Sequence, residues 1–192
     1  MRYSTPIILL KYLQYYFVAA NSKGHGIHSP FVFKLIQEQL NATSTMAEID
    51  KKNPEVKKIL SQMERATVFP LSLKIKLLIA RFVQKFNPSI ISVSGSKKQM
   101  EESINNESVD MAFIAEGLPK AAILDNATML LDKMHANSWM ILHGIHTDSN
   151  MEAAWNALKQ HANVRLTIDL FNIGILFCRE EQIEQEHFII RY

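Results

Sequence analysis

The sequence predicts an α/β domain of three layers, in which helices cover both faces of a mostly parallel sheet. Two patterns predict it. From residue 89 onward, short apolar segments of strand length alternate with longer segments of helical character, which is typical of a parallel sheet with crossover helices. Near the C-terminus, two apolar segments follow one another almost directly, which indicates an antiparallel hairpin at an edge of the sheet.

The first part of the chain is expected to be helical. It contains four helix-like segments, over residues 7–21, 30–40, 54–65 and 71–86. The first segment is amphipathic, because Leu9, Leu13, Tyr16 and Phe17 fall on one face and Lys11 falls on the other.

Local signals set the ends of these helices. Ser29 suits the N-cap of the second helix, and Pro30 suits its first position, where the missing N–H costs nothing. Residues 41–50 are polar and predict a loop. Asn87 precedes Pro88 and therefore ends the fourth helix, because a residue before proline avoids the helical conformation.

The second part of the chain supplies the sheet. Strands are predicted over residues 89–93, 109–115, 138–142, 164–171, 173–179 and 187–192, and helices over residues 97–104, 119–134 and 150–160. Asn172, with Gly174 nearby, permits the tight turn of the hairpin.

Composition is that of a packed soluble protein, with 47% hydrophobic and 21% charged residues among 192. The single cysteine, Cys178, cannot form an intrachain disulfide, which fits a reducing compartment. No apolar run approaches the roughly 20 residues that span a bilayer. We therefore expect a cytoplasmic protein and no membrane partner.

Charge is divided between the two halves of the chain. Residues 1–98 hold 15 Lys and Arg against 5 Asp and Glu, whereas residues 99–192 hold 6 against 14. A basic layer that pairs with an acidic one explains this, and so does a basic face for RNA or another anion. We favour the first explanation and do not expect nucleic acid as a partner, because the lysines are scattered and no arginine cluster marks a groove.

Three stretches of the chain carry a family resemblance. They are residues 25–33 (HGIHSPFVF), residues 144–155 (GIHTDSNMEAAW) and residues 167–192, which hold the hairpin and the C-terminal strand. In this order they resemble a bacterial branch of the class I S-adenosylmethionine-dependent methyltransferases. The resemblance implies a Rossmann-like sheet with the strand order 3-2-1-4-5-7-6.

The chain is too short for the complete sheet of that family. Between Gly95 and Val109 there is no room for the family's second and third strands. The resemblance therefore implies a reduced sheet of about five strands in the order 1-4-5-7-6, with an antiparallel C-terminal hairpin, formed by residues 71–192. Residues 1–70 would be a helical extension that covers the exposed first strand or its crevice. The N-terminal helices or the exposed sheet edge are the surfaces through which we expect a homodimer.

The cofactor crevice is where the sequence departs from the family. The resemblance places its remnant at Ser94, Gly95, Ser96, Glu116 and His143. The acidic residue that usually ends the first strand is a serine here, and two lysines follow the turn, which repel a cationic cofactor. His143 and Gly144 stand where the branch usually has two aspartates.

Loss of these polar contacts predicts weak cofactor binding. Each hydrogen bond to a charged group contributes about 1.5–3 kcal/mol, so three losses weaken binding by several powers of ten. We expect no cofactor, or S-adenosylmethionine if the site still functions. Another ligand could use the remnant, with Glu116 and Asp125 as its polar contacts.

The histidines and one aspartate allow other interpretations. The tetrapeptide His-Gly-Ile-His occurs at residues 25–28 and 143–146, and four imidazoles could bind zinc. The spacing is common by chance, and we expect no metal. Asp169 lies in an apolar strand, where a carboxylate needs a partner. We expect it to pair with Arg165 or Arg179, and a catalytic role is the alternative.

These observations lead to three hypotheses about function. The first is a methyltransferase-like pseudoenzyme that transfers no methyl group and serves as a binding or interaction module. The second is an active methyltransferase with a reduced site. The third is an RNA- or anion-binding module that uses the basic half of the chain. The sequence identifies no catalytic residue and no substrate.

Overall fold

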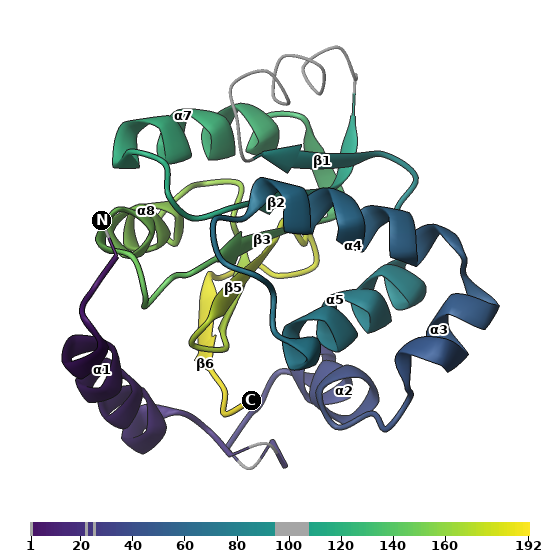
Figure 1. Ribbon diagram of the computed structural model, residues 1–192, viewed down its shortest axis with the longest axis horizontal. Coiled ribbons are helices and arrows are strands. Elements are labelled where there is room, and N and C mark those ends of the chain that lie inside the picture. The colour runs from purple at the N-terminus through teal and green to yellow at the C-terminus, as the bar shows by residue number, and fades with distance from the viewer. Residues whose placement is uncertain (1, 22, 25, 95–107) are drawn as a thin grey trace.

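The computed structural model describes residues 2–21, 23–24, 26–94 and 108–192 (Figure 1). Its helices and strands are α1 (Thr5–Val18), α2 (Pro30–Leu35), the π-helix η1 (Ile36–Leu40), α3 (Met46–Lys52), α4 (Glu55–Ala66), α5 (Leu73–Phe86), β1 (Ile91–Ser94), β2 (Val109–Ile114), α7 (Lys120–Leu131), β3 (Met134–His143), α8 (Ser149–Leu158), β4 (Leu166–Asp169), β5 (Ile173–Phe177) and β6 (Glu186–Ile189). The helix expected over residues 97–104 lies outside the described residues.

The described strands form one mixed sheet of six, in the order β1-β2-β3-β5-β4-β6. Strands β1, β2 and β3 are parallel, β5 runs antiparallel to both β3 and β4, and β6 is parallel to β4. An α/β protein with an antiparallel hairpin is thus confirmed. The sheet has one strand more than the expected five, because the C-terminal segment pairs beside β4.

Helices cover both faces of the sheet. Successive residues of a strand point to opposite faces, and β2 illustrates this: Phe113 packs in the core with α2, α3, α4 and α5, whereas Ala112 packs in the core with α7 and α8. Trp139 and Met140 divide in the same way along β3. Figure 1 shows α4 and α5 on one side of the sheet and α7 and α8 on the other.

The residue with the left-handed conformation in the hairpin turn is not one of the two that the sequence suggested. Phe171 takes the left-handed conformation, with φ 68°, whereas Asn172 and Gly174 were expected to permit the turn. Gly174 has another function. A Cβ atom there would lie 2.5 Å from the indole ring of Trp155 in α8. The glycine therefore lets α8 pack closely against β5.

One local prediction about helix ends needs correction, and another is confirmed. Residues 41–50 were expected to form a loop, but α3 begins at Met46. The signal was present, because Thr45 and Glu48 form a capping box in which each side chain bonds the other's backbone N–H. Ser29 is the N-cap of α2 as predicted, but its side chain makes no capping hydrogen bond.

Helix α1 does not cover β1, as a cap on the first strand would. The helix beside β1 is α4, and α1 lies at the periphery of the molecule near the C-terminal strand (Figure 1). The Tyr15 hydroxyl donates to the Ile190 carbonyl, and Ala20 forms a parallel bridge with Ile190. In the described part of the chain, no helix is long and apolar enough to cross a bilayer.

The contact between α8 and β5 can be tested by adding one methyl group. We expect Gly174→Ala to destabilise the protein by about 1–3 kcal/mol, because a rigid ring faces the new Cβ in a packed core. Urea unfolding measures the change. The double variant Gly174→Ala/Trp155→Phe should recover part of the loss, because the smaller ring makes room. Equal destabilisation in the single and double variants would contradict the close contact.

Candidate functional site

The carboxyl ends of the parallel strands meet at one edge of the sheet, where α/β proteins bind ligands. Ser94 is the last residue of β1, Glu116 follows β2 by two residues, and His143 is the last residue of β3. The structure thus brings Glu116 and His143 together at this edge. Gly95 and Ser96 lie outside the described residues.

Among the described residues of this crevice, Ser94, Glu116 and His143 are bonded to other groups of the protein. The Glu116 carboxylate contacts the His143 imidazole at Nδ1 and accepts a hydrogen bond of 3.1 Å from the Phe69 N–H. Both Glu116 and His143 are buried. The Ser94 hydroxyl is buried as well and accepts a hydrogen bond of 3.0 Å from the Asn126 amide.

The loop between α4 and α5 lies against Glu116. The Phe69 N–H bonds its carboxylate, and Val68 lies so close to Gly117 that a Cβ there would be 2.8 Å from a Val68 methyl group. The Arg2 guanidinium lies 3.7 Å from the centre of the Phe69 ring. Residues far apart in sequence therefore hold this loop at the ends of β2 and β3.

Glu116 is a carboxylate at neutral pH. Burial by itself would raise the pKa of Glu116, but the hydrogen bond and the charge of His143 outweigh burial and hold the pKa below its usual value. The two side chains form a buried, hydrogen-bonded pair rather than two groups that face a ligand.

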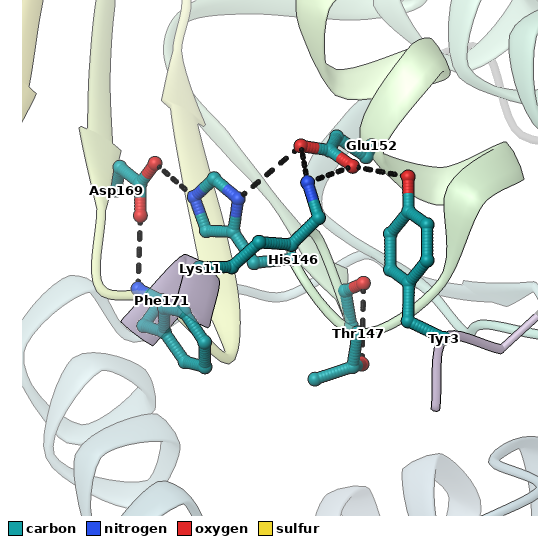
Figure 2. Close-up of polar contacts among 8 residues, drawn as sticks. Tyr3, Lys11, His146, Thr147, Glu152, Asp169 and Phe171 are labelled. Atoms are coloured by element: carbon teal, nitrogen blue, oxygen red, sulfur yellow. Dashed lines mark hydrogen bonds and ion pairs between the residues drawn. The ribbon is translucent and has the colours of Figure 1, made fainter. Parts of the chain in front are cut away.

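A second polar cluster joins Lys11 of α1 to His146, Glu152 and Asp169 (Figure 2). Asp169 ends β4, and its carboxylate accepts hydrogen bonds of 2.6 Å from His146 Nε2 and 2.9 Å from the Phe171 N–H. The imidazole of His146 stacks on the Phe171 ring, with centroids 5.3 Å apart. The left-handed Phe171 therefore supplies both a backbone donor and a stacking surface.

The expected partners of Asp169 are wrong. Arg179 pairs with Glu181, and Arg165 donates to the Ile183 carbonyl. His146 takes their place, because the loop after β3 and the end of β4 lie at the same edge of the sheet, whereas the arginines lie at the other ends of their strands.

Glu152 joins α8 to the N-terminal segment. Its carboxylate accepts hydrogen bonds from the Lys11 ammonium, at 2.7 and 2.9 Å, and from the Tyr3 hydroxyl, at 2.6 Å (Figure 2). Burial tends to raise the pKa of Glu152, but these two partners lower it below its usual value. The same hydrogen bond, together with burial, raises the pKa of Tyr3 to about 12.

The His146 imidazole lies between two carboxylates. Because a carboxylate oxygen only accepts, Nε2 donates in the 2.6 Å contact with Asp169. Nδ1, the other ring nitrogen, lies 3.7 Å from Oε1 of Glu152. The imidazole and the two carboxylates are the polar groups that a ligand at this cluster would meet.

A cavity of about 200 Å³ opens at this cluster. It is lined by Lys11, Gln14, Tyr15, Val18, His146, Glu152, Asp169 and Ile189. Helix α1 forms one wall, and the carboxyl ends of the strands form the other. Polar groups that converge in a largely apolar cavity are what a small-molecule site requires.

Sequence reasoning identified part of this cluster. His146 was noted as half of a repeated tetrapeptide and Asp169 as an acid in an apolar strand. The sequence does not assign Glu152, Lys11 and Tyr3 to a site. Lys11 and Glu152 are 141 positions apart, and no local pattern joins them. His143 and His146 contact different carboxylates, and the described residues contain no group of three or more His, Cys, Asp or Glu that could hold a metal ion.

The chain matches no protein-family model, no curated protein and no solved structure. The resemblance to methyltransferases stays a prediction from the three sequence stretches.

The buried pair of Glu116 and His143 makes a testable contribution to stability. We expect Glu116→Gln to lower the free energy of unfolding by about 1–3 kcal/mol at pH 7, because a hydrogen bond to a charged group is lost. The pKa of Glu116 is lowered in the folded state, so the stabilisation is complete above the unfolded pKa near 4.5 and is lost as the pH falls through the folded value. Urea unfolding of both proteins at pH 7 and at lower pH measures this.

The matched control is Glu184→Gln, because Glu184 is exposed. Its stability should stay within about 0.5 kcal/mol of the wild-type value at every pH. A difference between wild type and Glu116→Gln that does not shrink toward acid pH would contradict the ionised pair.

Proposed function

We propose that the protein is a methyltransferase-like α/β protein that transfers no methyl group and serves as a small-molecule binding module. One observation carries the proposal: the Glu116 carboxylate, at the edge where a cationic cofactor would need it, is already bonded to His143 and to the Phe69 N–H. The binding site is the neighbouring cavity under α1.

The strand order supports the likeness to methyltransferases. The first five strands along the chain lie in the order β1-β2-β3-β5-β4, which follows when two strands are removed from the 3-2-1-4-5-7-6 sheet of that family. The antiparallel β5 occupies the position of the family's antiparallel strand. The three sequence stretches described above agree with this order.

The chemistry of the crevice supports the loss of methyl transfer. S-adenosylmethionine carries an ammonium and a sulfonium group, which require acidic acceptors. Glu116 is occupied, and His143 replaces an acid with an imidazole that is itself engaged. Two lost hydrogen bonds to charged groups, at about 1.5–3 kcal/mol each, weaken binding by a factor of roughly a hundred to ten thousand.

The cavity under α1 supports a binding function and restricts the size and the polarity of the ligand. Tyr15, Val18 and Ile189 provide an apolar wall, while His146 and Glu152 provide polar groups. Its volume of about 200 Å³ is smaller than that of pockets for drug-sized ligands, which begin at about 300 Å³. A small, mostly apolar molecule with one polar group fits these properties.

Calorimetry with S-adenosylmethionine and with S-adenosylhomocysteine tests the loss of cofactor binding. We expect no saturable heat with either compound up to millimolar concentration, because the acceptors are occupied. Micromolar affinity for either compound would replace the proposal with an active methyltransferase that has a reduced site. A methyltransferase of known affinity, titrated in the same buffer, is the positive control.

The probe phenol, an aromatic ring with one hydroxyl group, tests the cavity. We expect saturable, millimolar binding to the wild type by ligand-observed NMR, and loss of binding in Val18→Trp, because the larger side chain fills the cavity beside α1. Ile183→Trp is the matched control, since Ile183 is exposed and does not line the cavity. Equal binding by all three proteins, or none by the wild type, would contradict this assignment.

A further inference from the structure

We infer that the protein forms a homodimer through the outward face of α1, an inference that does not depend on the proposed function. This face carries five large apolar side chains, which we name the α1 stripe: Leu9, Leu10, Leu13, Tyr16 and Phe17. All five are exposed, and Phe17 and Leu9 retain 80% and 59% of their accessible surface.

The α1 stripe is one continuous surface. Positions spaced by one, four, seven and eight residues lie on one side of an α-helix, with Leu13 at the centre of the stripe. Lys11 and Tyr15 lie on the opposite side and face the body of the protein. Of the α1 residues, all of which the structure describes, Tyr15 alone is buried.

The polar anchors of α1 fix this orientation. Lys11 bonds Glu152, Tyr3 bonds the same carboxylate, and Tyr15 bonds the Ile190 carbonyl. Figure 1 shows α1 at the periphery, with its other side turned away from the sheet and helices. A helix that is held rigidly before association loses little conformational freedom when it binds.

The area of the stripe reaches the minimum for a biological interface. Large apolar side chains that are about half exposed present roughly 100 Å² each. Two copies of the stripe would together remove roughly 1,000 Å² from water, which is about the minimum that a biological interface should bury. An apolar patch of about 500 Å² is near the upper end for the largest patch on a monomer, and such patches often bind a partner.

Charge favours a second copy of this chain as the occupant. Lys11 is the one charged residue in the sequence of α1, and it is paired with Glu152 at 2.7 Å. The stripe residues themselves therefore bring no charge into the contact. One cation from outside α1, Arg191, borders the stripe, with its guanidinium 4.1 Å from the centre of the Tyr16 ring. A helix that binds a membrane surface carries exposed Lys and Arg beside its apolar face, and α1 has none.

A two-fold axis near Leu13 satisfies these requirements. In an isologous interface each residue near the axis meets its own copy, and Leu13 is the centre of the stripe. Leu10, Leu13 and Phe17 also have the alternating spacing of three and four residues by which paired helices interdigitate. The contact is therefore expected to consist of two antiparallel α1 helices that cross at Leu13.

Light scattering coupled to size-exclusion chromatography tests the dimer. We expect the wild type at micromolar concentration to have twice the chain mass of 22.0 kDa. Leu13→Lys and Leu13→Glu should each be folded monomers, because a charge would meet its own copy. An equimolar mixture of these two variants should recover the dimer mass, because opposite charges then meet at the axis.

The control is Ile183→Lys, which places a charge at an exposed apolar residue outside the stripe and should leave the dimer intact. Circular dichroism shows that each variant is folded. A monomeric wild type overturns the inference, as does a Leu13→Glu variant that stays dimeric, or two folded variants whose mixture stays monomeric. A monomeric wild type that sediments with phosphatidylcholine vesicles would assign the stripe to a membrane surface instead.

Discussion

Carboxylates at the carboxyl-terminal edge of the sheet are buried and need hydrogen-bond partners within the protein. The positions of the surrounding loops and turns depend on these hydrogen bonds. Glu116 and Asp169 are buried, and a buried charge without a partner is costly. Glu116 is satisfied by His143 and the Phe69 N–H, which holds the α4–α5 loop. Asp169 is satisfied by His146 and the Phe171 N–H, which holds the turn of the hairpin in its left-handed conformation.

The same requirement explains how α1 packs. Glu152 is partly buried and draws both Lys11 and Tyr3 toward α8, while Tyr15 satisfies the carbonyl of Ile190. These polar contacts lie on the side of α1 opposite Leu13, so the apolar face must turn outward. Local amphipathicity would place that face in the core. The pairing of a carboxylate outweighs this preference, because leaving a partly buried charge without a partner is costly.

Helix α1 takes part in both the proposed ligand site and the proposed dimer contact. Its inner side forms a wall of the cavity at His146 and Glu152, and its outer side carries the α1 stripe. The crevice at Glu116 and His143 lies at the same edge of the sheet, and these two side chains are already paired. Function depends on particular side chains rather than on the fold, so under the proposed function the cavity, and not this crevice, binds the ligand.

The sequence by itself determined the features that depend on neighbouring residues. Alternating apolar segments predicted the mixed α/β sheet, Pro30 and Pro88 marked helix ends, and the close spacing of β4 and β5 predicted their hairpin. Thr45 and Glu48 also carried a legible capping signal for α3, which was missed. Only the tertiary structure decided which face of α1 is buried, that Asp169 pairs with His146, and that Gly174 makes room for Trp155. These features depend on contacts between groups that are distant in sequence and come together only when the sheet has formed. No local sequence pattern predicts such contacts.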